Sequence, residues 1–303
     1  MYDLISIGNI SVDIFYQGAS LTYTNNRFQF AIGGKYFADS IVESLGGGGA
    51  NVAIGGSKHG LKTAVLGHIG NNPFKSMILE KLRSHSVSTS LCQYVDNYFN
   101  LSSIFLTKTG ERSIVHYTSP HQHILSNKDD NHNLLNSQIV YMGNLQHVSL
   151  TEKCELLHFF KKHNKKVVVN FGANDCRRNN DQLKELLKPI DTLIINGHEF
   201  SDMVKVNYAD IDFTHHIIKK YIPYLSDKNI IITLGAKGSY AYTMDTIFHQ
   251  KAYSINKIVD TTGAGDGFTA GFISGFIKTK SLSEAMNVGA TYAAKILTQI
   301  GAN

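Results

Sequence analysis

One carboxylate, Asp266, follows a glycine-rich turn and opens an apolar run that predicts a helix. The turn is Gly263-Ala264-Gly265, and the apolar run continues to Phe272. At the start of a helix the backbone N–H groups have no partners within the helix, and the helix dipole favours negative charge. The amides of the turn are therefore predicted to form a site for an anion such as a phosphoryl group.

The position of Asp266 beside this anion site suggests a proton acceptor. The side chain is not expected to hold the anion, because like charges repel. A carboxylate next to a phosphoryl site can instead remove the proton from a hydroxyl group that attacks the phosphorus. The residues alone leave a second interpretation open, since acidic residues are common in first helical turns for dipole reasons.

Glycines and polar residues also stand where predicted strands end or helices begin. Asp13 comes shortly after the predicted strand 4–7, at the end of the strand where open α/β sheets bind ligands. Its carboxylate can accept hydrogen bonds from two vicinal hydroxyls. Gly47 and Asn51 belong to a glycine-rich segment before a predicted helix, and Asn51 offers both a donor and an acceptor. The alternative for Asp13 is a role as a turn or cap residue. The alternative for the glycine-rich segment is a flexible entry into the helix.

Two further segments follow predicted strands later in the chain. Asn196-Gly197-His198-Glu199 comes after the strand 193–195, and the second segment runs from Thr233 to Gly238. The first also has the pattern of a helix cap with a glutamate three residues on. A tight turn between strands is the alternative for the second.

Taken in order, these segments resemble the ribokinase-like (PfkB) carbohydrate kinase family. Residues 260–266 match its D-T-x-G-A-G-D signature, and residues 46–51 match G-G-x-G-x-N. Residues 196–199 and 233–238 match the N-x-x-E and T-x-G-x-x-G elements. The resemblance implies an ATP-dependent kinase that acts on a hydroxymethyl group of a small sugar.

The resemblance also implies a role for each matched residue. It makes Asp266 the catalytic base and the three residues before it the anion hole. The implied sugar contacts are Asp13, Gly47 and Asn51, and the implied nucleotide contacts are Asn196, Thr233, Gly235 and Gly238. Glu199 is expected to organise the water shell of Mg²⁺, and Asp260 and Thr262 to hold a monovalent cation such as K⁺.

Departures from the family pattern leave the acceptor open. Gly48 stands where ribokinases usually have lysine, Asn72 replaces an aspartate, and Asn144 lies where ribokinases use a glutamate. A nucleoside kinase of the same family and a non-catalytic sugar- or nucleotide-sensing relative are therefore alternatives. The intact Asp266 argues against a sensor, because binding alone needs no base.

Strand and helix patterns alternate along the chain. Short β-branched runs such as 139–142 and 167–169 are typical of strands buried on both faces, and helical patterns such as 151–163 and 213–224 separate them. We predict a three-layer α/β fold with a mainly parallel central sheet and a small β-sheet lid. Residues 1–13 and 41–303 are assigned to the kinase domain, 14–40 to the lid, and 91–118 to a hairpin, turning at 108–111, that contributes to the lid.

Composition argues against several other classes of protein. The 29 Lys and Arg residues exceed the 24 Asp and Glu residues, giving a net charge of +5, but they are scattered, so no nucleic-acid partner is expected. No apolar stretch approaches the ~20 residues of a membrane span. Cys92, Cys154 and Cys176 form no C-x-x-C pair and are expected to be free thiols in a cytoplasmic protein. Apolar residues such as Phe28 and Phe30 predict a homodimer through the lid.

Overall fold

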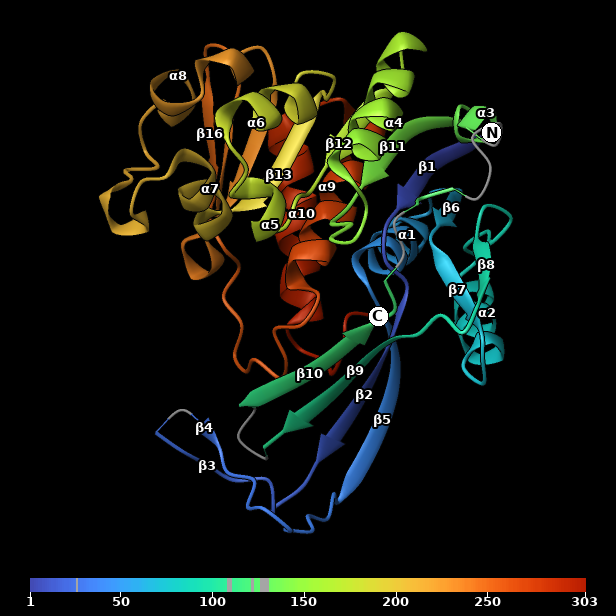
Figure 1. The fold of residues 1–303 in the computed structure, drawn as a ribbon. Coiled ribbons are helices and arrows are strands. Elements are labelled where there is room, and N and C mark those ends of the chain that lie inside the picture. The colour runs from blue at the N-terminus through green and yellow to red at the C-terminus, as the bar shows by residue number, and fades with distance from the viewer. Residues whose placement is uncertain (26, 108–110, 121–122, 126–130) are drawn as a thin grey trace.

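The body of the protein is one eight-stranded sheet covered by helices on both faces (Figure 1). The computed structural model describes residues 1–25, 27–107, 111–120, 123–125 and 131–303. The strand order is β16-β15-β14-β13-β12-β11-β1-β6. The strands are β1 (Tyr2–Ile7), β6 (Thr63–Leu66), β11 (Ser137–Met142), β12 (Lys166–Val169), β13 (Thr192–Asn196), β14 (Asn229–Thr233), β15 (Ser239–Tyr242) and β16 (Ile247–Gln250).

Most neighbours in this sheet run parallel, as the sequence predicted. Every pairing from β14 to β6 is parallel, whereas β15 and β16 pair antiparallel at one edge. The strand order reverses at β1, which lies between β11 and β6 although it comes first in the chain. Ligands of open α/β sheets bind beside the carboxyl ends of the strands at such a reversal.

Alternate residues of the strands enter two different cores. Val167 and Val169 pack in the core that includes Leu157 of α4, whereas Val168 packs in the core that includes Phe268 and Phe272 of α9. Both faces of the sheet are therefore buried, which explains the unbroken β-branched runs. The helices are α1 (Gly48–Lys58), α2 (Lys75–Ser84), α3 (Asn131–Leu134), α4 (Leu150–Lys162), α5 (Ala173–Cys176), α6 (Asn180–Leu187), α7 (Gly197–Val204), α8 (Ile217–Tyr221), α9 (Ala264–Thr279) and α10 (Leu282–Ile296).

The helix predicted over residues 213–224 is wrong at both ends. The structure forms only α8, followed by a 3₁₀ turn at Pro223–Leu225. At the first end, Asp212 accepts hydrogen bonds from the amide and hydroxyl of Thr214, which stabilise a turn instead of a helix. At the other end, Ile222 precedes a proline and has the non-helical angles φ −138° and ψ 59°, because the proline ring disfavours helical backbone before it.

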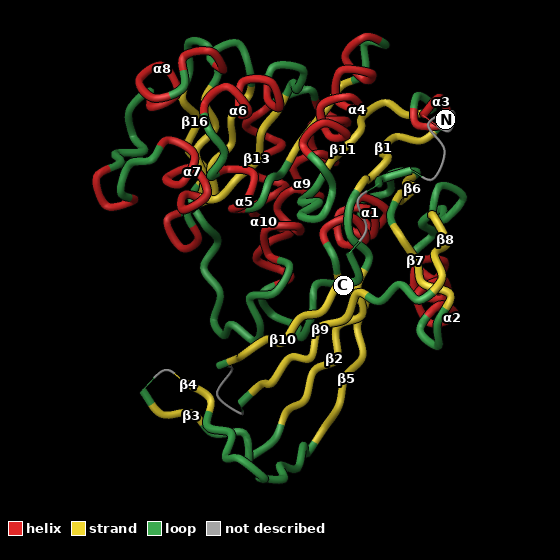
Figure 2. Tube along the Cα trace, viewed as in Figure 1, coloured by secondary structure: helices red, strands yellow, loops and turns green. Residues whose placement is uncertain are grey.

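A second, four-stranded sheet projects from the body (Figure 2). Its order is β10-β9-β2-β5, with β2 (Ser11–Gln17), β5 (Ser40–Gly46), β9 (Asn100–Leu106) and β10 (Arg112–Thr118). Because β2 pairs in parallel with β9, the segment predicted as the lid and the hairpin predicted to contribute to it form one continuous sheet. The first two strands of this sheet, β2 and β5, begin at Ser11 and end at Gly46, whereas the predicted limits of the lid were 14 and 40. The predicted turn at 108–111 includes residues 108–110, which lie outside the described residues.

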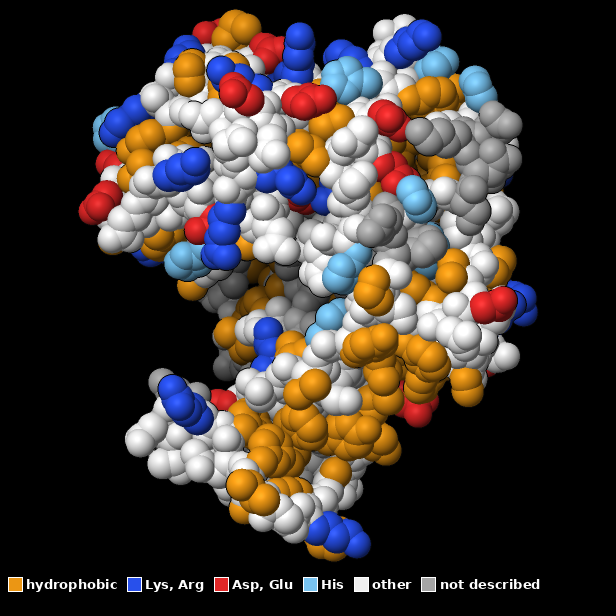
Figure 3. Space-filling model, viewed as in Figure 1, with side chains coloured by type: hydrophobic (Ala, Val, Ile, Leu, Met, Phe, Trp, Pro, Cys, Tyr) orange, Lys and Arg blue, Asp and Glu red, His pale blue; other side chains and the backbone are white. Residues whose placement is uncertain are grey.

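Smaller elements complete the fold. Two short sheets pair β3 (Tyr23–Thr24) with β4 (Arg27–Phe28), and β7 (His68–Asn71) with β8 (Gln93–Asp96). The space-filling view shows a hollow between the four-stranded sheet and the body (Figure 3). Within the part of the chain that the structure describes, every helix is too short or too polar to cross a bilayer.

Candidate active site

The first turn of α9 carries Asp266 and is shaped by Gly263. Gly263 precedes the helix with φ 76°, a left-handed conformation that glycine adopts without strain. A Cβ atom at this position would lie only 2.2 Å from the Cβ of Ala302, so glycine is also required by packing. No side chain in the described structure caps this helix, so the amides of Ala264 and Gly265 are left to bind an anion.

Asn51 holds the carboxylate of Asp266. The Asn51 Nδ2 atom, in the first turns of α1, donates to Asp266 Oδ2 at 2.7 Å. The Asn51 Oδ1 atom accepts in turn from Nδ2 of Asn303 at 2.8 Å. A Cβ atom built on Gly48 would lie 3.3 Å from Asp266 Oδ1, so any side chain at position 48 would face this carboxylate. The side-chain amide of Asn51, expected to contact sugar, thus orients the carboxylate of Asp266 in this structure.

The surroundings of Asp266 make it a stronger base than an ordinary aspartate. Burial raises the pKa of this half-buried carboxyl group, the hydrogen bond from Asn51 lowers it, and the charge of Asp13 raises it again. Burial also raises the pKa of Tyr141 well above its ordinary value, helped by the charges of Asp266 and Glu199. A proton acceptor whose pKa lies closer to neutral pH is the better catalyst of proton removal.

Asp13 belongs to a row of polar residues that crosses the four-stranded sheet. The register pairs Asp13 with Ser44 on one side and Ser102 on the other, and Ser102 with His116. Ser11 Oγ donates to Asp13 Oδ1 at 3.2 Å, and Ser102 Oγ lies 3.1 Å from His116 Nδ1. Burial raises the pKa of Asp13, whereas hydrogen bonds from Ser102 and Ser11 lower it. This row can bind several hydroxyl groups.

The glycine run allows this row to lie close to α1. A Cβ atom on Gly46 would lie 2.0 Å from Asp13 Oδ2, and one on Gly47 would lie 2.4 Å from the Asn9 carbonyl oxygen. Gly47 also has φ 88°, a left-handed conformation. The structure therefore uses both glycines for close packing, and contact of Gly47 with a sugar stays a prediction.

The predicted nucleotide element (residues 233–238) and the turn 263–265 before Asp266, called the anion loop below, line the same cavity. The cavity measures about 160 Å³ and includes Thr233, Gly235 and Gly238 together with Ala264 and Gly265. Its remaining lining is mainly apolar and includes Phe268, Ala290, Ala293 and Leu297. Ser239 also lines the cavity, and its Oγ is buried without a hydrogen-bond partner among the described residues. Apolar walls with few polar groups suit a flat heterocyclic base.

Asn196 and Glu199 form the capping box of α7. Asn196 Oδ1 accepts from the Glu199 amide at 2.9 Å, and Glu199 Oε2 accepts from the Asn196 amide at 2.8 Å. The register places Asn196 beside Thr233 of the nucleotide element. Burial raises the pKa of Glu199, and the backbone hydrogen bond lowers it. The helix cap that the sequence offered as an alternative interpretation is therefore present. The capping Glu199 carboxylate lies at the same end of the sheet as the cavity.

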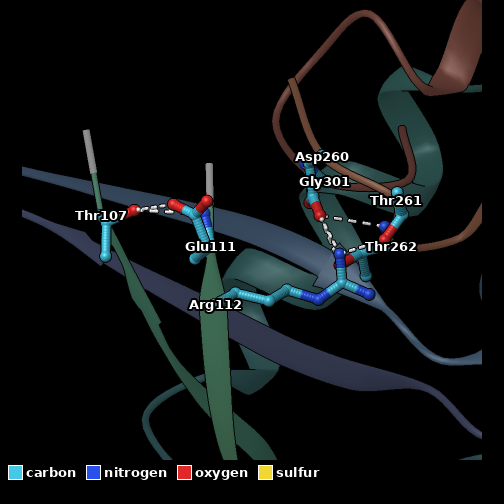
Figure 4. A network of polar contacts seen from close by, with 7 residues as sticks. All are labelled: Thr107, Glu111, Arg112, Asp260, Thr261, Thr262 and Gly301. Atoms are coloured by element: carbon cyan, nitrogen blue, oxygen red, sulfur yellow. Dashed lines mark hydrogen bonds and ion pairs between the residues drawn. The ribbon is translucent and has the colours of Figure 1, made fainter. Parts of the chain in front are cut away.

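Asp260 lies at the centre of a polar network before α9 (Figure 4). Its Oδ1 atom accepts from the Thr262 amide at 2.9 Å and the Thr262 hydroxyl at 2.8 Å, and its Oδ2 accepts from the Gly301 amide at 3.1 Å. Arg112 Nη1 donates to Oδ1 at 2.9 Å and also to the hydroxyl of Thr261. These donors do not fit a monovalent cation bound by Asp260 and Thr262, because a guanidinium group already balances the carboxylate.

Sequence reasoning missed Arg112, Ser102 and His116. All three project from β9 or β10. Arg112 and Asp260 are separated by 148 positions, and Ser102 pairs with Asp13 of the distant strand β2, whereas His116 meets Ser102 across the hairpin itself. The alternating pattern of these strands predicts which residues share a face. It does not predict which distant loop that face meets.

Comparison with known proteins identifies the family to which the chain is similar. The pfkB family carbohydrate kinase model matches residues 11–303. An ATP-dependent 6-phosphofructokinase of Thermoanaerobacterium thermosaccharolyticum is 26% identical, with coverage of 99% of this chain and 89% of the relative. A nucleoside kinase of Methanocaldococcus jannaschii is 25% identical over 99% of this chain and 92% of its own length.

The fold also matches a solved kinase structure. Arabidopsis thaliana ribokinase complexed with ribose and ATP superimposes with a TM-score of 0.82 at 24% identity, covering 99% of this chain and 94% of that one. The family match extends over nearly the whole chain and includes both the anion loop and the four-stranded sheet. The chain belongs to the pfkB family of carbohydrate kinases.

Proposed function

We propose that the protein transfers the γ-phosphoryl group of ATP to a hydroxymethyl group of a small sugar. The observation that carries this proposal is the Asn51-held carboxylate of Asp266 beside the uncapped amides of Ala264 and Gly265. The same amides line a cavity of about 160 Å³ whose apolar walls suit the base of a nucleotide. A binding protein would have no use for the base.

The residues of the chain divide the reaction between them. The polar row around Asp13 binds acceptor hydroxyls, and Asp266 takes the proton of the hydroxyl that attacks. A bond forms from that oxygen to the γ-phosphorus as the bond from phosphorus to the bridging oxygen of ADP breaks. The amides of Gly263, Ala264 and Gly265 stabilise the negative charge on the transferring group, and the electron pair leaves with ADP.

Mg²⁺ is the expected partner of the nucleotide. Within the described residues no three His, Cys, Asp or Glu side chains form a metal-binding cluster, whereas Mg²⁺ commonly needs only one or two carboxylates with waters and phosphates. Glu199 meets that requirement, because its carboxylate is hydrogen-bonded to the amide of Asn196, which lies beside Thr233 of the predicted nucleotide element. Bound Mg²⁺ would neutralise phosphate charge and orient the donor.

We also propose that the four-stranded sheet is a lid and that its outer face joins two copies of the chain. Ile41, Val115 and Tyr117 lie on the face opposite Asp13 and are 59%, 64% and 59% exposed. Exposed apolar patches of this kind mark association surfaces. Light scattering should show a dimer for the wild type and a monomer for Val115→Glu, and a monomeric wild type would contradict this part. The cytoplasmic location stays a prediction.

The experiment that tests the proposed function is an acceptor panel. ADP release with ATP and Mg²⁺ is measured for pentoses, aldohexoses, ketohexoses and nucleosides, with an Asp266→Asn blank. A ketohexose phosphate is included because one relative is a 6-phosphofructokinase. We expect the rate of ADP release with one class of sugar to exceed strongly the rate of the Asp266→Asn blank. Turnover with nucleosides alone would identify the nucleoside kinase alternative, and no turnover with any acceptor would favour the sensor.

A further inference from the structure

The buried carboxylate of Asp260 organises the turn that leads into the anion loop. Its side chain is 1% exposed and accepts hydrogen bonds from the amide and the hydroxyl of Thr262, the residue immediately before Gly263. The other oxygen accepts the Gly301 amide, which connects the turn to the segment after α10. The direction of the loop amides therefore depends on this one carboxylate.

A carboxylate buried in this way needs a positive partner. An unpaired buried charge is strongly destabilising, because it loses its hydration without compensation. Three of the contacts around Asp260 are neutral donors, and the ion pair comes from Arg112 at 2.9 Å. The Arg112 side chain is 28% exposed, so this pair is screened by water far less than a pair on the surface.

The partner comes from a different part of the fold. Arg112 begins β10 of the four-stranded sheet, and its guanidinium group reaches across to the loop before α9 (Figure 4). The backbone around Arg112 is itself held, since Thr107 and Glu111 exchange backbone and side-chain hydrogen bonds. A free ion would neutralise Asp260 wherever the sheet lies, whereas Arg112 can do so only when the sheet lies against the loop.

We propose that the guanidinium group of Arg112 takes the place of a free monovalent cation in this protein, and that it aligns the anion loop only when the four-stranded sheet is seated on it. Arg112 is thus a positioning residue that acts on the loop amides through Asp260. The inference rests on the proposed kinase function for its rate measurements, but not for its stability measurements. Phosphotransfer by the wild type is then independent of K⁺.

The test compares the wild type, Arg112→Met and Arg112→Lys in choline chloride, KCl and dilute guanidinium chloride at constant ionic strength. Arg177→Met is the matched control, because Arg177 makes an ion pair with Asp202 at 3.0 Å and is 64% exposed. The unfolding temperature and the phosphotransfer rate are measured for each. Arg112→Lys keeps a charge but lacks the planar fork of arginine.

We expect the phosphotransfer rate of the wild type and of Arg177→Met to differ less than about twofold between choline and K⁺. Both proteins keep the guanidinium group of Arg112 beside Asp260. Arg112→Met should lose on the order of 10²-fold in rate in choline, as expected for a misaligned site. K⁺ or guanidinium should restore part of that rate and raise the unfolding temperature of this variant alone. Arg112→Lys should be less impaired.

Three results would overturn the proposal. In the first, the wild type loses more than about tenfold in phosphotransfer rate without K⁺. In the second, Arg112→Met is as active as the wild type in choline. In the third, neither K⁺ nor guanidinium restores the rate that Arg112→Met has lost. If Arg112→Met does not fold, Arg112→Lys carries the comparison, and a strong K⁺ requirement in it counts as support. If no acceptor is phosphorylated by the wild type, the proposed function fails, and the ion-specific shift in unfolding temperature still decides the role of Arg112.

Discussion

Replacing Asp266 with asparagine should affect activity and stability in opposite directions. The substitution keeps the size of the side chain and leaves an oxygen that can accept the 2.7 Å hydrogen bond from Asn51. The position of the loop amides should therefore not change. What disappears is the ability to take a proton, which contributes roughly 10²- to 10⁴-fold to turnover, or about 2.7 to 5.4 kcal/mol of the activation barrier.

The effect on stability follows from the raised pKa of Asp266. Burial and the charge of Asp13 make the ionised form less favourable in the folded protein than in the unfolded chain. A carboxyl group with a raised folded pKa binds more protons when folded, so it destabilises the protein as pH rises through its titration. The asparagine side chain carries no charge, and the unfolding temperature of the Asp266→Asn variant should therefore be higher at neutral pH.

The matched control is Asp96→Asn. Asp96 also accepts a 2.7 Å hydrogen bond from an asparagine, Asn71, but this pair is exposed and lies on β7 and β8. Turnover with the best acceptor and the unfolding temperature are measured for both variants. The control should match the wild type in both. An Asp266→Asn variant that keeps more than about a tenth of wild-type turnover would refute the assignment of this residue as the base.

Three other predictions test the surroundings of the site and the core. Plots of kcat/KM against pH should fall on the acid side, and Asn51→Ala should move that fall to higher pH, because it removes the hydrogen bond that lowers the pKa of Asp266. Glu199→Gln should raise the Mg²⁺ concentration needed for half-maximal rate, measured by Mg²⁺ titration at saturating ATP. Lys153→Met should reduce the free energy of unfolding by about 1 to 3 kcal/mol, because the 1% exposed lysine side chain makes a 2.6 Å ion pair with the buried carboxylate of Asp175, which keeps its 2.8 Å pair with Arg178. Lys166→Met, which breaks a pair whose lysine is 67% exposed, should cost no more than about 1 kcal/mol in urea unfolding.

Each of these three has a clear contrary outcome. An unchanged pH profile in Asn51→Ala would mean that another group controls the acid limb. An unchanged Mg²⁺ titration in Glu199→Gln would remove this residue from the metal site. Equal losses of stability for Lys153→Met and Lys166→Met would show that the buried ion pair contributes no more than the exposed one.

Local patterns were enough to predict the layered body of the fold. A run such as Val167–Val169 must be buried on both faces, and the helices between such runs must cover the two faces of one sheet. The predicted helix over 213–224 failed because Asp212 and Pro223 carry turn and proline signals that outweigh its apolar pattern. The antiparallel edge strands β15 and β16 are only four residues each and give little periodic signal.

The site was predictable only where its residues are close together in the chain. Gly263 to Asp266 make one turn, so their arrangement follows from the backbone of a helix start. The bond from Asn51 to Asp266 joins residues 215 positions apart, and no periodicity indicates it. The same holds for Arg112, which reads in the sequence as an ordinary charged residue of a hairpin.

The interleaving of β2 and β9 has a consequence for protein engineering. The sheet that carries Asp13, His116 and Arg112 draws its central pair of strands from two distant stretches of the gene. Exchange of either stretch alone with a homologue would pair one foreign strand with one resident strand and disrupt the register between Asp13 and Ser102. Chimeras that redirect acceptor choice will therefore need both stretches from the same donor, transferred together.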